Sequence, residues 1–144
     1  MKQEKSKISV LMSVYKKENP EYLRASLESI LVQTRTAAEI LLIEDGPLTQ
    51  ELYQVVAEYQ KKCDYLHVHA MEQNVQLGRA LAKGVELCKY DLIARMDTDD
   101  IAMPDRLEKE GAYMEAHPEV DVVGGAIREF NDEGTIDRVK NMPK

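Results

Sequence analysis

Three carboxylates fall within four residues in the stretch Asp97-Thr98-Asp99-Asp100, which Arg95-Met96 joins to the apolar run Leu92-Ile93-Ala94. Unit charges about 4 Å apart repel each other by roughly 4 kcal/mol at an effective dielectric of about 20. A divalent cation bound between them removes that repulsion. Carboxylate oxygens suit hard ions such as Mg²⁺ or Mn²⁺, whereas Zn²⁺ favours nitrogen and sulfur ligands. The stretch therefore predicts a site for Mg²⁺ or Mn²⁺.

The acidic stretch has two other interpretations besides a metal site for Mg²⁺ or Mn²⁺. The aspartates could simply solvate and cap a turn before the next helix, because Asp is common in turns. An EF-hand loop would place Asp97, Asp99 and Glu108 at its positions one, three and twelve. Ile101 then stands where an oxygen ligand is needed and Ala102 where the sharp turn needs glycine, so the calcium-sensor interpretation is set aside.

The composition of the chain is that of an ordinary globular domain. A chain of 144 residues suits one domain that buries about two-thirds of its surface. The net charge of −7 argues against nucleic acid as a partner, which needs a basic face. Cys63 and Cys88 have no metal-like spacing and are expected to be free thiols in a reducing compartment. No apolar run of about 18 residues and no signal-peptide core is present, so a cytoplasmic location is expected.

Apolar runs alternate with helical patterns along the chain. Strands are expected at 8–14, 39–43, 65–71, 90–96 and 120–127, helices at 20–33, around 52–59, at 77–88 and at 104–117, and a turn at 131–134. In the third helix Leu77, Leu81, Val85 and Cys88 are expected to face inward. Strands that alternate with helices indicate an α/β fold, an open and mostly parallel sheet with helices on both faces.

In such sheets ligands bind beyond the carboxyl ends of the strands. The groups expected to converge there are Ser13-Val14-Tyr15, Glu44-Asp45-Gly46 and Asp97-Thr98-Asp99-Asp100. The loop at 15–19, after the first strand, contains no glycine, which disfavours a dinucleotide fold and a P-loop. A phosphate at this edge would instead be held by a metal and by side chains such as Arg79 or Arg95.

Taken together, these residues resemble the family 2 glycosyltransferases, inverting enzymes with the Rossmann-like GT-A nucleotide-diphospho-sugar transferase fold. The matching stretches are Met12-Ser13-Val14-Tyr15, residues 23–33, Glu44-Asp45-Gly46, residues 74–84, and Asp97-Thr98-Asp99-Asp100 followed by Met103-Pro104-Asp105-Arg106-Leu107. The resemblance extends over about residues 8–125. The order and spacing of the stretches carry it more than any one of them.

The resemblance implies a UDP-sugar donor, bound with Mg²⁺ or Mn²⁺, and transfer of the sugar to the hydroxyl of a saccharide or lipid-linked acceptor. Synthesis of a cell-surface polysaccharide or lipopolysaccharide is the expected setting. The implied nucleotide contacts are Val14 and Tyr15 on the uracil ring, Glu18 on the ribose, Asp45 on the uracil with Glu44 beside it, Arg79 on the uracil or a phosphate, and Asp97 on the ribose. The DXD motif can be read in two frames, so the implied metal ligands are Asp99 and, beside it, Asp100.

Members of this family also need a half that holds the acceptor and supplies a carboxylate general base. The resemblance places that base beyond residue 144, so residues 1–144 are expected to form one nucleotide-sugar-binding domain truncated before the acceptor-binding half. Membrane association is then expected only through the missing parts, and the oligomeric state stays open. The alternatives are a stand-alone sugar-nucleotide-binding or regulatory module and a sugar nucleotidyltransferase, which would need a Gly-rich basic loop after the first strand.

Overall fold

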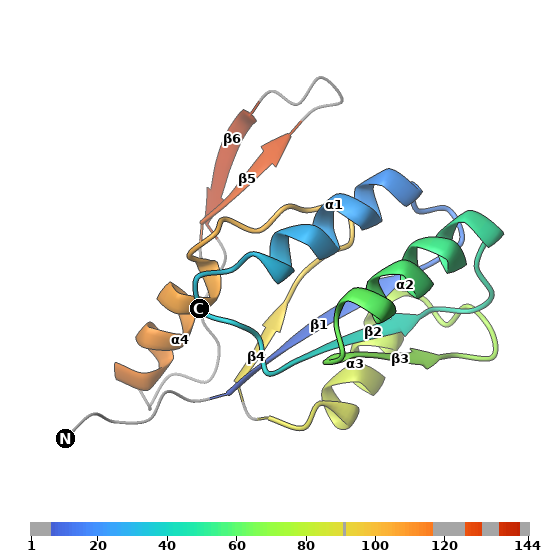
Figure 1. Ribbon diagram of the computed structural model, residues 1–144, viewed down its shortest axis with the longest axis horizontal. Coiled ribbons are helices and arrows are strands. Elements are labelled where there is room, and N and C mark those ends of the chain that lie inside the picture. The colour runs from blue at the N-terminus through green and yellow to red at the C-terminus, as the bar shows by residue number, and fades with distance from the viewer. Residues whose placement is uncertain (1–6, 91, 117–125, 131–135, 142–144) are drawn as a thin grey trace.

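An open sheet of four parallel strands, in the order β3-β2-β1-β4, forms the centre of the protein (Figure 1). The computed structural model describes residues 7–90, 92–116, 126–130 and 136–141. The strands of this sheet are β1 (Ile8–Val14), β2 (Glu39–Glu44), β3 (Leu66–Ala70) and β4 (Leu92–Arg95), and the helices are α1 (Pro20–Leu31), α2 (Gln50–Lys62), α3 (Leu77–Leu87) and α4 (Arg106–Ala116). A separate antiparallel pair consists of β5 (Ala126–Phe130) and β6 (Ile136–Asn141). The predicted open, parallel α/β architecture is confirmed.

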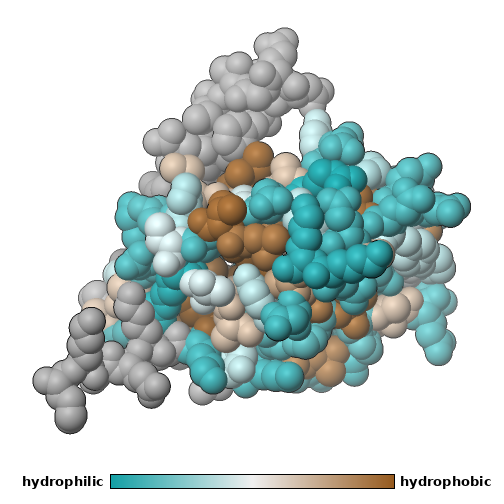
Figure 2. Space-filling model, in the orientation of Figure 1, coloured by the Kyte–Doolittle hydropathy of each residue, from teal (hydrophilic) through white to brown (hydrophobic). Residues whose placement is uncertain are grey.

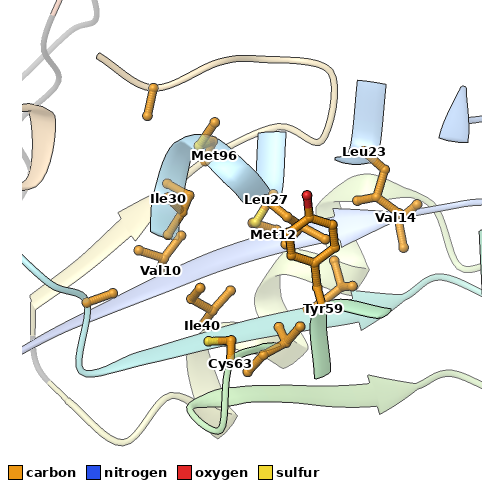
Figure 3. Close-up of a cluster of buried hydrophobic side chains, with 14 of the residues drawn as sticks. Val10, Met12, Val14, Leu23, Leu27, Ile30, Ile40, Tyr59, Cys63 and Met96 are labelled. Carbon is orange, nitrogen blue, oxygen red and sulfur yellow. The ribbon is translucent and has the colours of Figure 1, made fainter. Parts of the chain in front are cut away.

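The two central strands are buried on both faces, as expected of a parallel sheet covered by helices. In β1, Val10, Met12 and Val14 point to one side, where they pack with Leu23 and Leu27 of α1 and with residues of α2. Figure 3 shows this larger core, in which Met12, Leu27 and Tyr59 lie close together. Most of the apolar burial therefore lies between the sheet and the α1/α2 layer.

The opposite face of the sheet is covered by α3. Leu11, Leu41 and Ile43 of the strands form a smaller core there with Ala80 and Leu81 of the helix. No helix within the described ranges is both long and apolar enough to cross a membrane.

The beginning of α1 agrees with its sequence signals. The Asn19 side chain accepts a hydrogen bond from the Glu21 amide at 2.8 Å, and Pro20 occupies the first helical position. Pairing of Val14 with Glu44 and of Leu11 with Arg95 keeps the three strands in register. Their carboxyl ends therefore open onto one edge of the sheet.

The predicted inner face of α3 is right for Leu81, which is buried, and for Cys88, which packs against the smaller core, but wrong for Leu77 and Val85. Leu77 and Val85 are 48% and 52% exposed, whereas Ala80, Leu81 and Gly84 are buried. The helix lies so close to the sheet that a Cβ on Gly84 would come within 2.3 Å of the Leu11 side chain. Ala80 and Gly84 thus form the contact together with Leu81, whereas Leu77 and Val85 lie outside it.

The strand β6 was not predicted, and the remaining differences concern boundaries. The fourth strand is shorter than predicted, and α4 begins at Arg106 instead of Pro104. Some predicted features lie outside the described residues: most of the strand at 120–127, the turn at 131–134 and the helix end at 117. The described part of that region begins with β5 at Ala126.

Candidate functional site

The acidic loop, which we define as residues 97–100, follows β4 at the carboxyl edge of the sheet. One carboxylate oxygen from each of Asp97, Asp99 and Asp100 lies within 4.8 Å of the other two. The Asp100 amide donates to the Asp97 carbonyl at 3.2 Å, which closes a tight turn. Oxygens on opposite sides of a hard cation are about twice the 2.0–2.6 Å bond length apart, so these residues fit one shared divalent ion.

Thr98 joins the acidic loop to the loop that follows β1. Its hydroxyl donates to a carboxylate oxygen of Glu18 and lies 3.4 Å from the Ser13 carbonyl. The second Glu18 oxygen accepts a hydrogen bond from the Asn19 amide at 2.9 Å. Tyr15, in the same loop, has 46% of its surface exposed. The structure therefore brings together the predicted residues of the first and fourth strand ends.

Asp45 joins the end of β2 to the segment that leads into α3. Its amide donates to the Val14 carbonyl at 2.8 Å, and its carboxylate accepts from the Val75 amide at 2.7 Å. The Asn74 side chain donates to the Asp45 carbonyl at 3.2 Å and lies 3.3 Å from the carboxylate. Gly46 has φ 87°, and a Cβ there would lie 2.6 Å from the Asn74 amide nitrogen, so only glycine fits.

Glu44 is as deeply buried as Asp45 but in a different environment. By strand alternation it shares the face of Ile40 and Leu42, toward the larger core. Burial raises the pKa of its carboxyl group, because loss of water penalises the ionised form. The end of β2 therefore carries one hydrogen-bonded carboxylate and one desolvated carboxyl group.

The two candidate arginines are less closely tied to the site. Arg79 is exposed in the first turn of α3, shortly after the segment that Asp45 holds. Arg95 is exposed at the end of β4, and its carbonyl accepts a hydrogen bond from the Arg106 guanidinium at 2.7 Å. Hydrogen bonds thus connect the loops of Glu18, Asp45 and the aspartates, while the arginines lie near them only by chain position.

Four side chains that contact these loops were not predicted. Ser26 and Ser29 of α1, and Gln33 just beyond its end, hydrogen-bond to the chain between β4 and α4. Asn74 bonds to Asp45. The available signal was the presence of polar residues beside the apolar stripe of α1.

Apolar surface borders the acidic loop on one side. Figure 2 shows hydrophobic surface near the C-terminal end of α1. Val32, at that end, is 59% exposed, and Ile101 and Met103, which follow the acidic loop, are 48% and 43% exposed. Charged and apolar surfaces therefore meet at this edge of the protein.

Comparison with known proteins gives relatives over nearly the whole chain. An uncharacterized glycosyltransferase of Haemophilus influenzae is 48% identical over 138 residues, which cover 95% of this chain and 51% of the relative. The amylovoran biosynthesis glycosyltransferase AmsE of Erwinia amylovora is 45% identical over 135 residues, covering 94% and 50%. The chain thus spans about half the length of these curated relatives.

Among solved structures, TarS 1–349 of S. aureus in complex with UDP-GlcNAc matches with a TM-score of 0.71 at 20% identity, covering 92% of this chain and 37% of that one. At this identity the match shows the fold, which is the GT-A fold. The sequence model described as glycosyl transferase family 2 matches residues 9–144. With the acidic loop placed at the carboxyl edge of such a sheet, the chain belongs to glycosyl transferase family 2.

Proposed function

We propose that this chain binds a UDP-sugar together with Mg²⁺ or Mn²⁺ and forms the donor-binding part of an inverting glycosyltransferase. The observation that carries the proposal is the convergence of three carboxylates at the strand edge that also holds Asp45 and Tyr15. Family membership and the UDP-GlcNAc complex of TarS support a nucleotide sugar as the ligand.

The proposed division of roles is the one that membership of glycosyl transferase family 2 implies. Asp99 and Asp100 would hold the divalent cation, and the nucleoside would be held by Val14, Tyr15, Glu18, Asp45, Arg79 and Asp97. Tyr15 offers an exposed aromatic face for stacking on the base. When bound, a divalent cation supplies charge stabilisation to the departing diphosphate. The carboxylate base that takes the acceptor proton would lie outside residues 1–144.

The acceptor is proposed to be a saccharide or lipid-linked saccharide on the cytoplasmic side of a membrane. Support comes from the relative AmsE, whose name assigns it to amylovoran biosynthesis. The apolar residues beside the acidic loop would suit an acceptor that carries a lipid.

Calorimetric titration of UDP into the chain, once with Mn²⁺ and once with EDTA, tests the proposal. Binding is expected with Mn²⁺ and is expected to be at least about tenfold weaker with EDTA, because the diphosphate then meets uncompensated carboxylates. Asp99→Asn and Asp100→Asn should each remove most of the increase in UDP affinity that Mn²⁺ produces. GDP in place of UDP tests the uracil assignment and should bind more weakly.

Asp64→Asn is the matched control, because Asp64 is an exposed aspartate before β3, at the opposite edge of the sheet. It should bind UDP and Mn²⁺ like the unaltered chain. Equal UDP affinity in Mn²⁺ and EDTA, or no binding by a chain that circular dichroism shows to be folded, would contradict the proposal.

A further inference from the structure

Three polar side chains lie in the buried interface beneath α1. Ser26 is fully buried, and Ser29 and Gln33 are each 7% exposed. Their spacing of three and four residues puts them along one side of the helix and its extension. A buried polar group without a hydrogen-bond partner is costly, so the partners of these side chains show what they do.

The two serines bond to the chain on either side of Asp99 and Asp100. The Ser26 hydroxyl donates to the Asp97 carbonyl at 3.3 Å. The Ser29 hydroxyl accepts from the Ala102 amide at 3.0 Å and donates to the Ser26 carbonyl at 2.7 Å. The last two aspartates of the acidic loop are therefore held between two backbone anchors.

Gln33 uses both ends of its amide in the same region. Its nitrogen donates to the Met103 carbonyl at 2.6 Å and to the Ser29 carbonyl at 3.0 Å. Its oxygen accepts from the Leu107 amide at 3.0 Å, in the first turn of α4. One side chain thus connects α1, the chain that follows the acidic loop, and the beginning of α4.

These bonds are made to backbone atoms within residues 97–107 and not to the carboxylates of the acidic loop. Neighbouring carboxylates repel one another, so a loop without anchors would separate them. A ligand set that is already gathered loses less conformational freedom when it binds an ion. Anchors on both sides of the aspartates therefore favour the gathered arrangement.

We propose that Gln33, Ser26 and Ser29 are positioning residues. They hold the backbone of the acidic loop in the conformation that binds the divalent cation. This inference rests on the proposed function, since it concerns the same metal site. Gln33 bonds to backbone atoms and would not itself touch the ion. It acts through the Met103 and Leu107 backbone, and its loss changes the affinity for metal.

The test is a titration of the chain with Mn²⁺ in the presence of saturating UDP, with free Mn²⁺ followed by electron paramagnetic resonance. Gln33→Met keeps the length of the side chain and removes its amide. Its Mn²⁺ affinity is expected to fall about tenfold, as when the supporting partners of metal ligands are removed. Ser26→Ala, which removes a single bond with little change in volume, should show a smaller loss in the same direction.

Val55→Ala is the control for a general loss of stability. Val55 is buried in α2, within the larger core, and the substitution is expected to lower the melting temperature while Mn²⁺ affinity stays within about twofold, because distant sites act independently. All titrations are made at a temperature where circular dichroism shows each variant to be folded.

The outcomes separate this inference from the proposed function. If the unaltered chain with UDP binds no Mn²⁺, both are overturned. If the unaltered chain binds Mn²⁺ and Gln33→Met binds it equally well, only the positioning role is overturned. A loss in Val55→Ala as large as that in Gln33→Met would also overturn it, because the loss would then follow stability alone.

Discussion

Two adjacent acidic residues at the end of β2, Glu44 and Asp45, differ in the surroundings of their carboxyl groups. The Asp45 carboxylate accepts a hydrogen bond from the Val75 amide and lies within reach of the Asn74 side chain. Burial alone raises the pKa of Glu44 above its ordinary value of 4.5. The folded state therefore binds a proton at Glu44 more tightly than the unfolded state does, and stability falls as pH rises from about 4.5 through the folded pKa.

Glu44→Gln tests this sign. The neutral amide removes the penalty of an ionised buried carboxylate, so the variant should gain stability relative to the unaltered chain as the pH rises from 4 to 8. The measurement is the free energy of unfolding from urea denaturation at several pH values. Glu72→Gln, on an exposed loop residue, is the control and should show no such trend. A difference between Glu44→Gln and the unaltered chain that does not change with pH would contradict the assignment.

At this scale the sequence predicted the charged groups but not their supports. Asp45 and the acidic loop were expected at strand ends, because apolar runs stop there and the ends of parallel strands share an edge. The roles of Ser26, Ser29 and Gln33 were not predicted. Polar residues beside the apolar stripe of α1 were the available signal, but they do not show that the partners are backbone atoms about 70 residues further along the chain.

Among the elements, α3 shows how a helix can pack through its small residues. Hydrophobic periodicity predicts that Leu77 and Val85 face the sheet, but both are exposed. Ala80 and Gly84 instead allow the helix to approach the strands closely, and Gly84 lies against Leu11 of β1. Periodicity of large apolar residues therefore predicted α3, its place in the chain and the burial of Leu81, but not the part of the buried face that Ala80 and Gly84 form.

Two glycines of α3 should respond to alanine with opposite signs. Gly84→Ala places a methyl group against the Leu11 side chain in a packed core and should destabilise the protein by about 1–3 kcal/mol. Gly78→Ala meets no atom within 4 Å and should stabilise it by up to about 1 kcal/mol, because alanine loses less backbone entropy in a helix. Urea denaturation of both variants measures this, and a stabilising Gly84→Ala would show that the helix does not approach the strands so closely.

The sequence predicted all four strands of the parallel sheet but not β6. The runs that became β1 and β2 are apolar on both faces and match their predicted ranges closely, because a doubly covered parallel strand needs such a run. β4 is shorter than predicted: it begins at Leu92 and ends at Arg95, after which the chain turns into the acidic loop. The apolar pattern of one segment does not show where its pairing with the neighbouring strand ends.

The molecule as a whole has two unequal cores. Among the described residues, the core between the sheet and the α1/α2 layer contains twenty buried residues, and the one beneath α3 contains five. Apolar burial is the main stabilising term in folding, so the two faces of the sheet contribute unequally to stability. The exposed Leu77, Val85 and Leu87 on α3 add little to the smaller core.

This inequality predicts the order in which the protein opens. Regions with few buried apolar contacts open at lower free energy than the global unfolding reaction, so α3 amides should exchange with solvent through a partial opening, whereas β1 and β2 amides should require global unfolding. Native-state hydrogen exchange in low concentrations of urea, followed by mass spectrometry, measures the two classes. Leu81→Ala should speed exchange in α3 with little effect on β1, while Leu27→Ala in the larger core should speed exchange in both. Exchange of α3 and β1 at one common free energy would mean that the smaller core is as cooperative as the larger one, and that α3 is held by more than the residues buried beneath it.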